Sequence, residues 1–232
     1  MKIAIMQPYF FPYIGYFQLI AAVDLFVLYD NIQYTKKGWI NRNRILLNGS
    51  DSVISLPLKK DSDTLDVSER ELAVSFKPGK LLAQLDGAYR KAPYFEHTMS
   101  LVEATLLQNT SNLFTFLHHG LVKTCAHLGI TTPIHISSGI DIDHTLKGQD
   151  KVLAICKATG AHTYVNAIGG QALYLTEDFL REGIELRFIR SQAFSYEQFG
   201  APFVPWLSLI DVLMFNPVPC VRSAIEHNYE LL

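Results

Sequence analysis

The sequence predicts an α/β fold with a mostly parallel sheet and helices on both faces of that sheet. Short apolar runs of strand length alternate with helical patterns, which is typical of parallel sheets. Several of these runs end in turns of small residues just before a helical pattern begins. Apolar residues make up 49% of the 232 residues, enough to bury a sizeable core. We therefore expect a single domain over residues 1–232.

The chain opens with a strand–helix–strand pattern. Residues 2–6 form an apolar run of strand length, residues 17–23 a short helical pattern, and residues 25–29 a second buried strand. A right-handed crossover places the loop after the first strand at the carboxyl edge of the sheet.

Two more strands follow, and then a segment of another kind. Residues 44–47 and 52–58 read as strands joined at the turn signal Asn48-Gly49. Residues 59–76 are charged and weakly patterned, so we expect an exposed excursion there.

A mainly helical insertion is expected at about residues 77–130. The helical pattern from 80 to 128 pauses at Pro93 and again at residues 108–112. Asn112 is suited to cap the helix that ends near Gly129.

Alternation of strands and helices then resumes. Strands are expected at 133–136, 163–166 and, as the last of them, 185–189, with helices at 150–158 and 176–181. The residues from 203 to 216 form an almost wholly apolar helical stretch that contains Asp211.

Composition narrows the class of protein. The formal net charge of −2 gives no reason to expect a nucleic-acid partner. Three widely spaced cysteines favour a reducing compartment, and the amino terminus lacks a secretion-signal pattern. No apolar run has the ~18 residues of a membrane helix, so no membrane insertion is expected. We expect a cytoplasmic protein whose oligomeric state the sequence does not indicate.

The aromatic loop, residues 7–16, is the strongest candidate binding element. It reads Gln-Pro-Tyr-Phe-Phe-Pro-Tyr-Ile-Gly-Tyr, with Gly15 placed where the following helix would begin. Free N–H groups and the positive dipole end of a helix at this edge suit an anionic ligand such as a phosphate. The alternative is that the five aromatic side chains of the loop only pack over the end of the sheet.

The cationic segment, residues 36–44, should lie at the same edge because it follows the second strand. Arginine guanidinium groups bind phosphate or carboxylate in a bidentate way, and the indole of Trp39 can stack on a base or sugar. The alternative is a charged loop that is only solvated.

A third group of candidates follows the later strands. Asn166 ends a buried strand, and Gly169 and Gly170 permit close approach of the backbone. Lys147 or Lys151 would neutralise a phosphate. The alternative makes Asp150 a first-turn acid, Lys151 a solvent-facing residue and the glycine pair an ordinary turn.

Other motifs in the sequence are weaker evidence for a functional site. Asp211 is either a base with a raised pKa or the partner of Ser208 in a capping box, and we favour the capping box. No histidine or cysteine spacing supports a metal site. Hydrolase-elbow, dinucleotide-binding and P-loop motifs are missing from the sequence.

The aromatic loop resembles the His-x-Gly-His loop of nucleotidyltransferases and acyl-adenylate ligases. Its position, proline and glycine are similar, but Tyr13 and Tyr16 replace the two histidines. A phenol with a pKa of about 10 donates a hydrogen bond but supplies no positive charge. The resemblance implies a nucleotidyltransferase-like (HUP-like), three-layer fold and phosphate binding more than the same chemistry.

The chain as a whole resembles the WbqC-like family. The matching segments are the aromatic loop, Asn41-Arg42-Asn43, Lys147-Gly148-Gln149-Asp150, Tyr164-Val165-Asn166 with Gly169-Gly170, and residues 203–216. The resemblance implies a role in O-antigen, lipopolysaccharide or other surface-polysaccharide synthesis, with some members linked to attaching amino-acid or acyl groups to amino sugars.

From these observations we predict a transferase or amide ligase that moves an acyl or aminoacyl group to an amine. Its substrate would be a nucleotide-sugar or amino sugar, an acyl-adenylate would be one route, and ATP or another nucleotide with Mg²⁺ the cofactor. The alternatives are a nucleotidylyltransferase acting on a sugar phosphate and a non-catalytic nucleotide-sugar binding protein. The candidate catalytic residues are Tyr13, Tyr16, Arg42 and Lys147, and the candidate binding residues are Gln7, Pro8, Tyr9, Phe10, Gly15, Lys37, Trp39, Asn41, Arg44, Ser137, Ser138, Asn166, Gly169 and Gly170.

Overall fold

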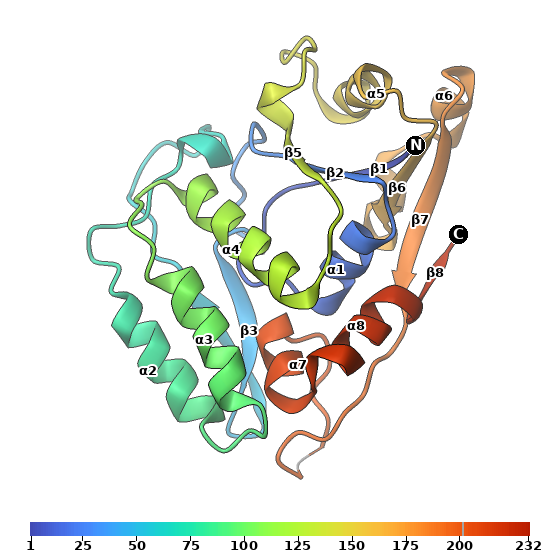
Figure 1. Cartoon of the computed structure of the whole chain (residues 1–232). Helices are drawn as coiled ribbons and strands as arrows, with labels where there is room; N and C mark the ends of the chain where they lie inside the picture. Colours follow the sequence, from blue (N-terminus) through green and yellow to red (C-terminus); the bar gives the residue numbers. More distant parts are fainter. Residues whose placement is uncertain (201) are drawn as a thin grey trace.

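The fold is built on a mixed, mostly parallel sheet. In this computed structural model, which describes residues 1–200 and 202–232, the strand order is β5-β2-β1-β6-β7-β8 (Figure 1). The strands are β1 (Lys2–Met6), β2 (Leu25–Leu28), β5 (Ile134–Ile136), β6 (Thr163–Ala167), β7 (Glu185–Ser191) and β8 (Tyr229–Leu231). Strands β5, β2, β1, β6 and β7 are parallel, and β8 pairs antiparallel with β7. The predicted parallel sheet is confirmed, but residues 185–189 are not the last strand, because β8 follows.

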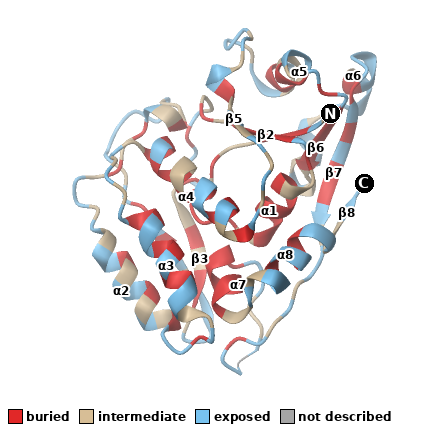
Figure 2. Ribbon diagram, viewed as in Figure 1, coloured by how far each residue is buried: buried red, intermediate tan, exposed pale blue. Residues whose placement is uncertain are grey.

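Helices cover both faces of the sheet. Helices α1 (Ile14–Ala21) and α8 (Val218–His227) lie on one side, and α5 (Gly148–Ala158) and α6 (Thr176–Arg181) on the other (Figure 1). Alternation along β1 sends Ala4 into the core with α1, and Ile3 and Ile5 into the core with α5 and α6. Buried positions accordingly follow the central strands and the inner helix faces (Figure 2). The three-layer α/β architecture is confirmed.

The predicted helical insertion consists of α2 (Pro78–Tyr89), α3 (Phe95–Leu106) and α4 (Leu113–Leu128). Asn112 caps α4 as expected, because its side chain accepts a hydrogen bond of 2.9 Å from the amide of Thr115. Gly129 ends α4 with φ of 68°, a left-handed conformation that glycine adopts without strain.

A separate antiparallel hairpin of β3 (Arg42–Leu47) and β4 (Ser50–Ser55) packs beside this insertion. Its turn has positive φ at both Asn48 (53°) and Gly49 (77°), as tight hairpins require. The predicted turn is therefore confirmed.

Three local predictions are wrong. Helix α1 begins at Ile14 rather than at residue 17, so Gly15 lies inside its first turn. Residues 59–76 are not simply exposed, because Val67 is fully buried in a short 3-10 helix, η1 (Val67–Glu69), and Arg70 is buried over the ring of Tyr34.

The third wrong prediction is the long helix expected in the apolar stretch at 203–216. Helix α7 (Leu209–Phe215) is shorter than that stretch, because Ser208 takes a non-helical backbone conformation (φ −50°, ψ 150°) and caps the helix through its hydroxyl. Two further 3-10 turns, η2 (Ser137–Gly139) and η3 (Ile168–Leu173), follow β5 and β6. No helix in the described part of the chain is long and apolar enough to cross a membrane.

Candidate functional site

The aromatic loop and the cationic segment lie against each other at the carboxyl edge of the sheet. The amide of Phe10 donates to the carbonyl of Trp39 at 3.1 Å. The Asn43 side-chain amide donates to the carbonyls of Phe10 (3.1 Å) and Phe11 (2.7 Å). These bonds join the end of β1 to the start of β3, two segments that are separate in the sequence.

The segment before α7 fixes the other side of the aromatic loop. The Ser208 hydroxyl donates to the carbonyl of Phe11 at 2.8 Å, and the amide of Leu209 donates to the carbonyl of Pro12 at 2.8 Å. Tyr16 closes the loop from within α1, because its hydroxyl donates to the carbonyl of Gln7 at 3.0 Å. The loop therefore has a defined shape without any ligand.

A cavity of about 520 Å³ lies at the point where these segments meet. It sits beyond the carboxyl ends of β1, β6 and β7, where open α/β sheets bind their ligands. Aromatic side chains form much of its wall, and its volume falls in the range of small-molecule sites. Its lining residues are Met6, Tyr9, Tyr13, Gly15, Tyr16, Leu19, Trp39, Asn43, Arg44, Ala167, Ile168, Gly169, Ile189, Ser191 and Trp206.

The tyrosines of this aromatic cavity act as neutral hydrogen-bonding groups. Burial raises the pKa of Tyr9, Tyr13 and Tyr16 above the ordinary value of 10.0, so all three are protonated at pH 7. A hydrogen bond with Ser191 opposes part of the shift in the pKa of Tyr13. These phenols can orient an oxyanion but cannot supply charge to it.

Arg44 is the one charged residue among the described residues that line the aromatic cavity. Its guanidinium lies 5.7 Å from the ring centre of Trp39 and contacts Asp51 at 3.2 Å. The Nε atom of Arg44 is buried and has no hydrogen-bond partner. A ligand cannot reach this buried atom. The Nη1 and Nη2 atoms, however, make one hydrogen bond each, to Asp51 and to the Trp206 carbonyl, so each keeps a second N–H for a phosphate or carboxylate.

Both tryptophans of the chain stand at this cavity. Trp39 is 39% exposed and Trp206 is 49% exposed, although large aromatic side chains are normally buried on folding. The ring of Trp206 meets Tyr13 edge-on at 6.3 Å, and its carbonyl accepts from Arg44 at 3.3 Å. Trp206 also has φ of 59°, a rare conformation for a bulky residue that is typical of functional segments.

Gly15 makes room for protein side chains at the base of the cavity. A Cβ atom on Gly15 would lie 2.4 Å from both the Ser191 hydroxyl and the Tyr13 ring. The glycine thus allows the tyrosine ring to fold back over α1. It also allows α1 to approach β7.

The other residues predicted in the cationic segment hold its backbone. Arg42 donates to the carbonyls of Gly38 (3.0 Å) and Lys37 (2.6 Å), and its guanidinium lies 5.8 Å from the ring centre of Trp39. Asn41 accepts from Tyr34 at 2.8 Å and donates to Leu56 at 2.8 Å. The Lys37 side chain is exposed. Arg42, Asn41 and Lys37 lie beside the cavity but do not line it.

Of the predicted residues after β6, one lines the cavity and the others hold the local structure. Gly169 lines the cavity, whereas Asn166 is buried at the end of β6 and accepts a hydrogen bond from the amide of Ala167 at 2.8 Å. A Cβ atom on Gly170 would lie 2.6 Å from the Asn166 side-chain nitrogen, so the glycine makes space for that side chain.

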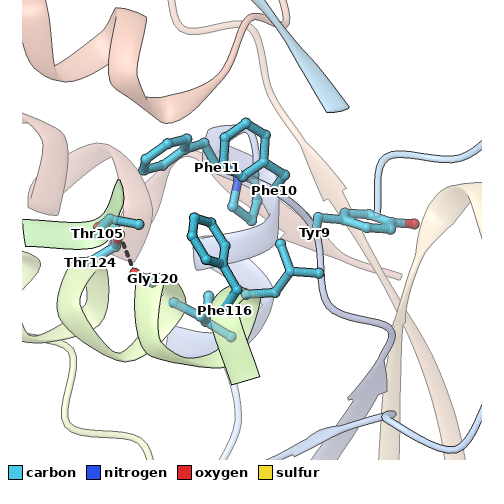
Figure 3. A pocket seen from close by; sticks show the side chains of 10 residues that line it. Tyr9, Phe10, Phe11, Thr105, Phe116, Gly120 and Thr124 are labelled. Carbon is cyan, nitrogen blue, oxygen red and sulfur yellow. Dashed lines mark hydrogen bonds between the residues drawn. The ribbon is translucent and has the colours of Figure 1, made fainter. Parts of the chain in front are cut away.

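The predicted residues of the first loop outside the cavity are buried or half-buried. Pro8 is buried in the loop, and Gln7 donates to the Tyr9 hydroxyl at 3.1 Å. Phe10 packs against Phe116 of α4 beside a gap of only about 10 Å³. Figure 3 shows this gap, with Phe10, Phe11 and Phe116 around it and the Thr124 hydroxyl bonded to Gly120. The gap is too small for a metabolite.

The remaining predicted residues lie at the ends of β5 and β2, away from the aromatic cavity. Ser137 is buried and donates to Asp30 at 2.9 Å, Ser138 is exposed, and Lys147 is exposed just before α5. Lys151, which the alternative interpretation placed in solvent, is only 4% exposed, so that part of the alternative is wrong. Asp150 lies in the first turn of α5 as expected.

Asp211 does not form the predicted capping box. Ser208 caps α7 by accepting from Ile210, while the Asp211 carboxylate is fully buried and points elsewhere. It accepts from Tyr89 (2.8 Å), Tyr196 (2.5 Å) and Gln198 (2.7 Å). Burial raises the pKa of Asp211, and these three hydrogen bonds oppose the shift. The residue joins α2, α7 and the segment after β7.

Asn43, Ser191 and Trp206 reach the cavity from three different segments but were not among the predicted site residues. Asn43 and Trp206 lie in segments that resemble the family, whereas no sequence signal marked Ser191. Among the described residues, no group of three or more histidine, cysteine, aspartate or glutamate side chains is placed to hold a metal ion.

These features define the class: a three-layer α/β protein with an aromatic cavity at the carboxyl edge of its sheet. The model of the WbqC-like protein family matches residues 7–222, and the chain belongs to this family. A curated relative is the uncharacterized protein Rv1507c of Mycobacterium tuberculosis (strain ATCC 25618 / H37Rv), 27% identical over 218 residues, which are 93% of each chain. No solved structure matches the chain.

Proposed function

We propose that the protein binds a nucleotide or nucleotide-sugar in the aromatic cavity and transfers an acyl or aminoacyl group to an amine. One observation carries the binding part: both tryptophans, three tyrosines and an arginine with unused N–H donors on its terminal nitrogens surround a single cavity of about 520 Å³. Exposed indole rings stack on bases or sugar rings, and an arginine fork binds phosphate. This combination suits a ligand that has both a base or sugar ring and a phosphate group.

The reaction part rests on what the aromatic cavity offers and on the resemblance of its loop to amide-forming ligases. No described lining residue is a cysteine, histidine, aspartate or glutamate, so the wall supplies neither a strong nucleophile nor an ordinary base. Direct attack by a substrate amine on an activated carboxyl group requires no protein nucleophile. Activation of the carboxylate by ATP would form an acyl-adenylate and release pyrophosphate. Attack of the amine would then form the amide, with AMP as the leaving group and one proton lost to solvent. The protein would then bind and orient the substrates and exclude water from them.

The same lining supports a second candidate, a binding protein without turnover. A cavity whose described wall has hydrogen-bond donors and aromatic surface, but no ordinary acid–base group, is sufficient for recognition alone. Nucleotidylyl transfer to a sugar phosphate is a third candidate, because it needs the same phosphate contacts. A cytoplasmic location and a role in surface-polysaccharide synthesis belong to the proposal.

A thermal-shift panel tests the binding part. ATP, CTP, UDP-sugars and dTDP-amino sugars, each with Mg²⁺, should include a ligand that raises the unfolding midpoint, because binding to the folded state stabilises it by mass action. A panel in which no compound shifts the midpoint at millimolar concentration would contradict the proposal.

A product assay separates the three candidates. The protein is incubated with ATP, a mixture of carboxylic and amino acids and the best-binding amino sugar nucleotide, and products are identified by mass spectrometry. Amide formation with pyrophosphate release supports acyl transfer. Pyrophosphate release that depends on a sugar phosphate supports nucleotidylyl transfer, and binding without any product supports the binding protein.

A further inference from the structure

The segment between β7 and α7 (Figure 1) leaves the aromatic cavity at Ser191 and returns to it at Trp206. Trp206 is 49% exposed, so the core does not fix its indole ring, and the place of the ring depends on how the backbone on either side is held. On the carboxyl side, the Ser208 amide donates to the carbonyl of Arg44 and the Ser208 hydroxyl to the carbonyl of Phe11, both at 2.8 Å. A different set of contacts holds the amino side.

A buried glutamine, Gln198, holds the backbone on the amino side of Trp206. Gln198 is only 1% exposed. Its amide oxygen accepts from the backbone N–H of Val204 at 2.7 Å, and its amide nitrogen donates to the carbonyl of Val204 at 3.2 Å. The same nitrogen donates to the Asp211 carboxylate at 2.7 Å. Both N–H groups and the oxygen of this side-chain amide are therefore engaged.

The carboxylate of Asp211, in α7, fixes the orientation of that amide. Its Oδ1 accepts from the Tyr196 hydroxyl at 2.5 Å as well as from Gln198, and its Oδ2 accepts from Tyr89 at 2.8 Å. Because a carboxylate only accepts hydrogen bonds, the amide nitrogen of Gln198 faces it and the amide oxygen is left for the N–H of Val204. Asp211 is fully buried, and hydrogen bonds away from water are stronger and hold a single geometry.

Trp206 thus lies between two anchors, Val204 two positions before it and Ser208 two positions after it. Its φ of 59° is a conformation that a bulky residue keeps only where the surrounding structure imposes it. In this conformation the indole meets the Tyr13 ring, and the Trp206 carbonyl accepts from Arg44. Loss of the amino-side anchor would let the backbone relax and the indole leave the cavity wall.

We propose, on the basis of the function proposed above, that Gln198 and Asp211 are positioning residues that hold the Trp206 indole in place to stack on the base or sugar ring of the bound ligand. Neither residue lines the aromatic cavity, so both act through the backbone of Val204. An indole that is already ordered does not have to lose its conformational freedom when the ligand binds, and the affinity is higher for that reason.

A ¹⁹F NMR spectrum of protein labelled with 5-fluorotryptophan reports the place of Trp206 with no ligand present. The chain has two tryptophans, so two resonances are expected, and Trp39→Phe identifies the resonance of Trp206. Gln198→Met removes the amide from a side chain of the same length. We expect the Trp206 resonance to move or broaden in this variant and the Trp39 resonance to stay. An unchanged Trp206 resonance would overturn the proposal.

Gln18→Met is the matched control, because it makes the same change at another buried glutamine. The Gln18 amide nitrogen donates to the carbonyls of Ala224 and Asn228 and joins α1 to α8, away from Trp206. This variant should leave the Trp206 resonance in place, and an equal change there would show a general loss of stability and contradict the proposal. If Gln198→Met does not fold, Gln198→Asn replaces it, since an amide one methylene shorter cannot reach both Val204 and Asp211.

Titration of the same labelled proteins tests the effect on binding. ATP, CTP, UDP-sugars and dTDP-amino sugars, each with Mg²⁺, are added while the Trp206 resonance is followed. We expect the Kd of a binding compound to rise about 3- to 10-fold in Gln198→Met and to stay unchanged in Gln18→Met. An unchanged Kd in Gln198→Met would overturn the positioning role. If no compound binds the wild type, the nucleotide proposal fails and the stacking role of Trp206 fails with it, whereas the ligand-free spectra still decide whether Gln198 holds the ring.

Discussion

At the scale of single residues, Arg44 and Arg42 show that two identical side chains close together in sequence can have different roles. They stand two positions apart on β3, and both lie over Trp39, at 5.7 and 5.8 Å. Arg42 bonds to two backbone carbonyls of its own segment, whereas Arg44 lines the aromatic cavity with its Nε unpartnered. Spacing alone could not separate them, because the difference comes from where the segment turns.

The first prediction concerns Arg44. Arg44→Gln should weaken binding of the nucleotide or nucleotide-sugar about 10- to 100-fold, since a hydrogen bond to a charged group contributes roughly 1.5–3 kcal/mol. Isothermal titration calorimetry measures the change. Arg90→Gln, which loses only a surface pair with Asp86, is the matched control and should bind as wild type. An unchanged Kd in the Arg44 variant would remove this residue from the site.

The second prediction concerns Asp211 and pH. Burial raises the pKa of Asp211 in the folded protein above its ordinary 3.8, so the folded state binds the proton more tightly than the unfolded state does. The contribution of this group to stability is therefore fully present below about pH 3.8 and is lost as pH rises through the folded pKa. Asp211→Asn lacks this titration.

Urea unfolding of both proteins at pH 4 and at pH 7 measures the effect of Asp211. The difference in unfolding free energy should move in favour of the wild type on going from pH 7 to pH 4. Other carboxyl groups titrate equally in the two proteins and cancel in the difference. The same difference at both pH values would show that Asp211 does not titrate in this range.

At the scale of elements, the first turn of α1 decides the shape of the cavity. The expected helix began at residue 17, because the prolines and aromatic residues before it resemble a loop. In the structure α1 starts at Ile14, and Gly15 within its first turn admits the Tyr13 ring and the Ser191 hydroxyl. The contact with Ser191 is tertiary, so no local pattern could reveal it.

The third prediction concerns Gly15. Gly15→Ala should displace the Tyr13 ring, destabilise the protein by about 1–3 kcal/mol and weaken ligand binding. Gly79→Ala in α2 is the control, since nothing lies within 4 Å of its Cβ position. That change should stabilise the helix by about 0.5–1 kcal/mol. Urea unfolding measures both, and a neutral Gly15→Ala would show that the ring moves without cost.

The helices and strands also show which parts of the fold sequence patterns could predict and which they could not. The strands at the sheet centre, the three helices of the insertion and the Asn48-Gly49 turn follow from local periodicity and turn chemistry, and they are confirmed. The edge strand β8 was missed, because its three residues carry no pattern and are ordered by pairing with β7. The burial of Lys151 was missed because helical spacing does not show what packs over a first turn.

At the scale of the whole molecule, the carboxyl edge of the sheet gathers residues from distant parts of the sequence. The aromatic loop and the cationic segment were expected to meet there, and hydrogen bonds between Phe10, Trp39 and Asn43 join them. Trp206 completes the cavity from near the carboxyl terminus. Its position depends on the Ser208 anchor to the loop, a contact that only the folded chain creates.

This arrangement makes the intrinsic fluorescence of the protein a direct probe of the aromatic cavity. The chain has two tryptophans, both lining this cavity and both partly exposed. A ligand that stacks on either indole must change the emission, while binding elsewhere leaves both indoles in place.

Titration of tryptophan emission with the panel of nucleotides and nucleotide-sugars is the most direct measurement of the central claim. We predict a saturable change with at least one compound, shifted to higher concentration in Arg44→Gln and unchanged in Arg90→Gln. Emission that stays constant with every compound, or a saturable change with the same midpoint in Arg44→Gln, would contradict nucleotide binding in this cavity.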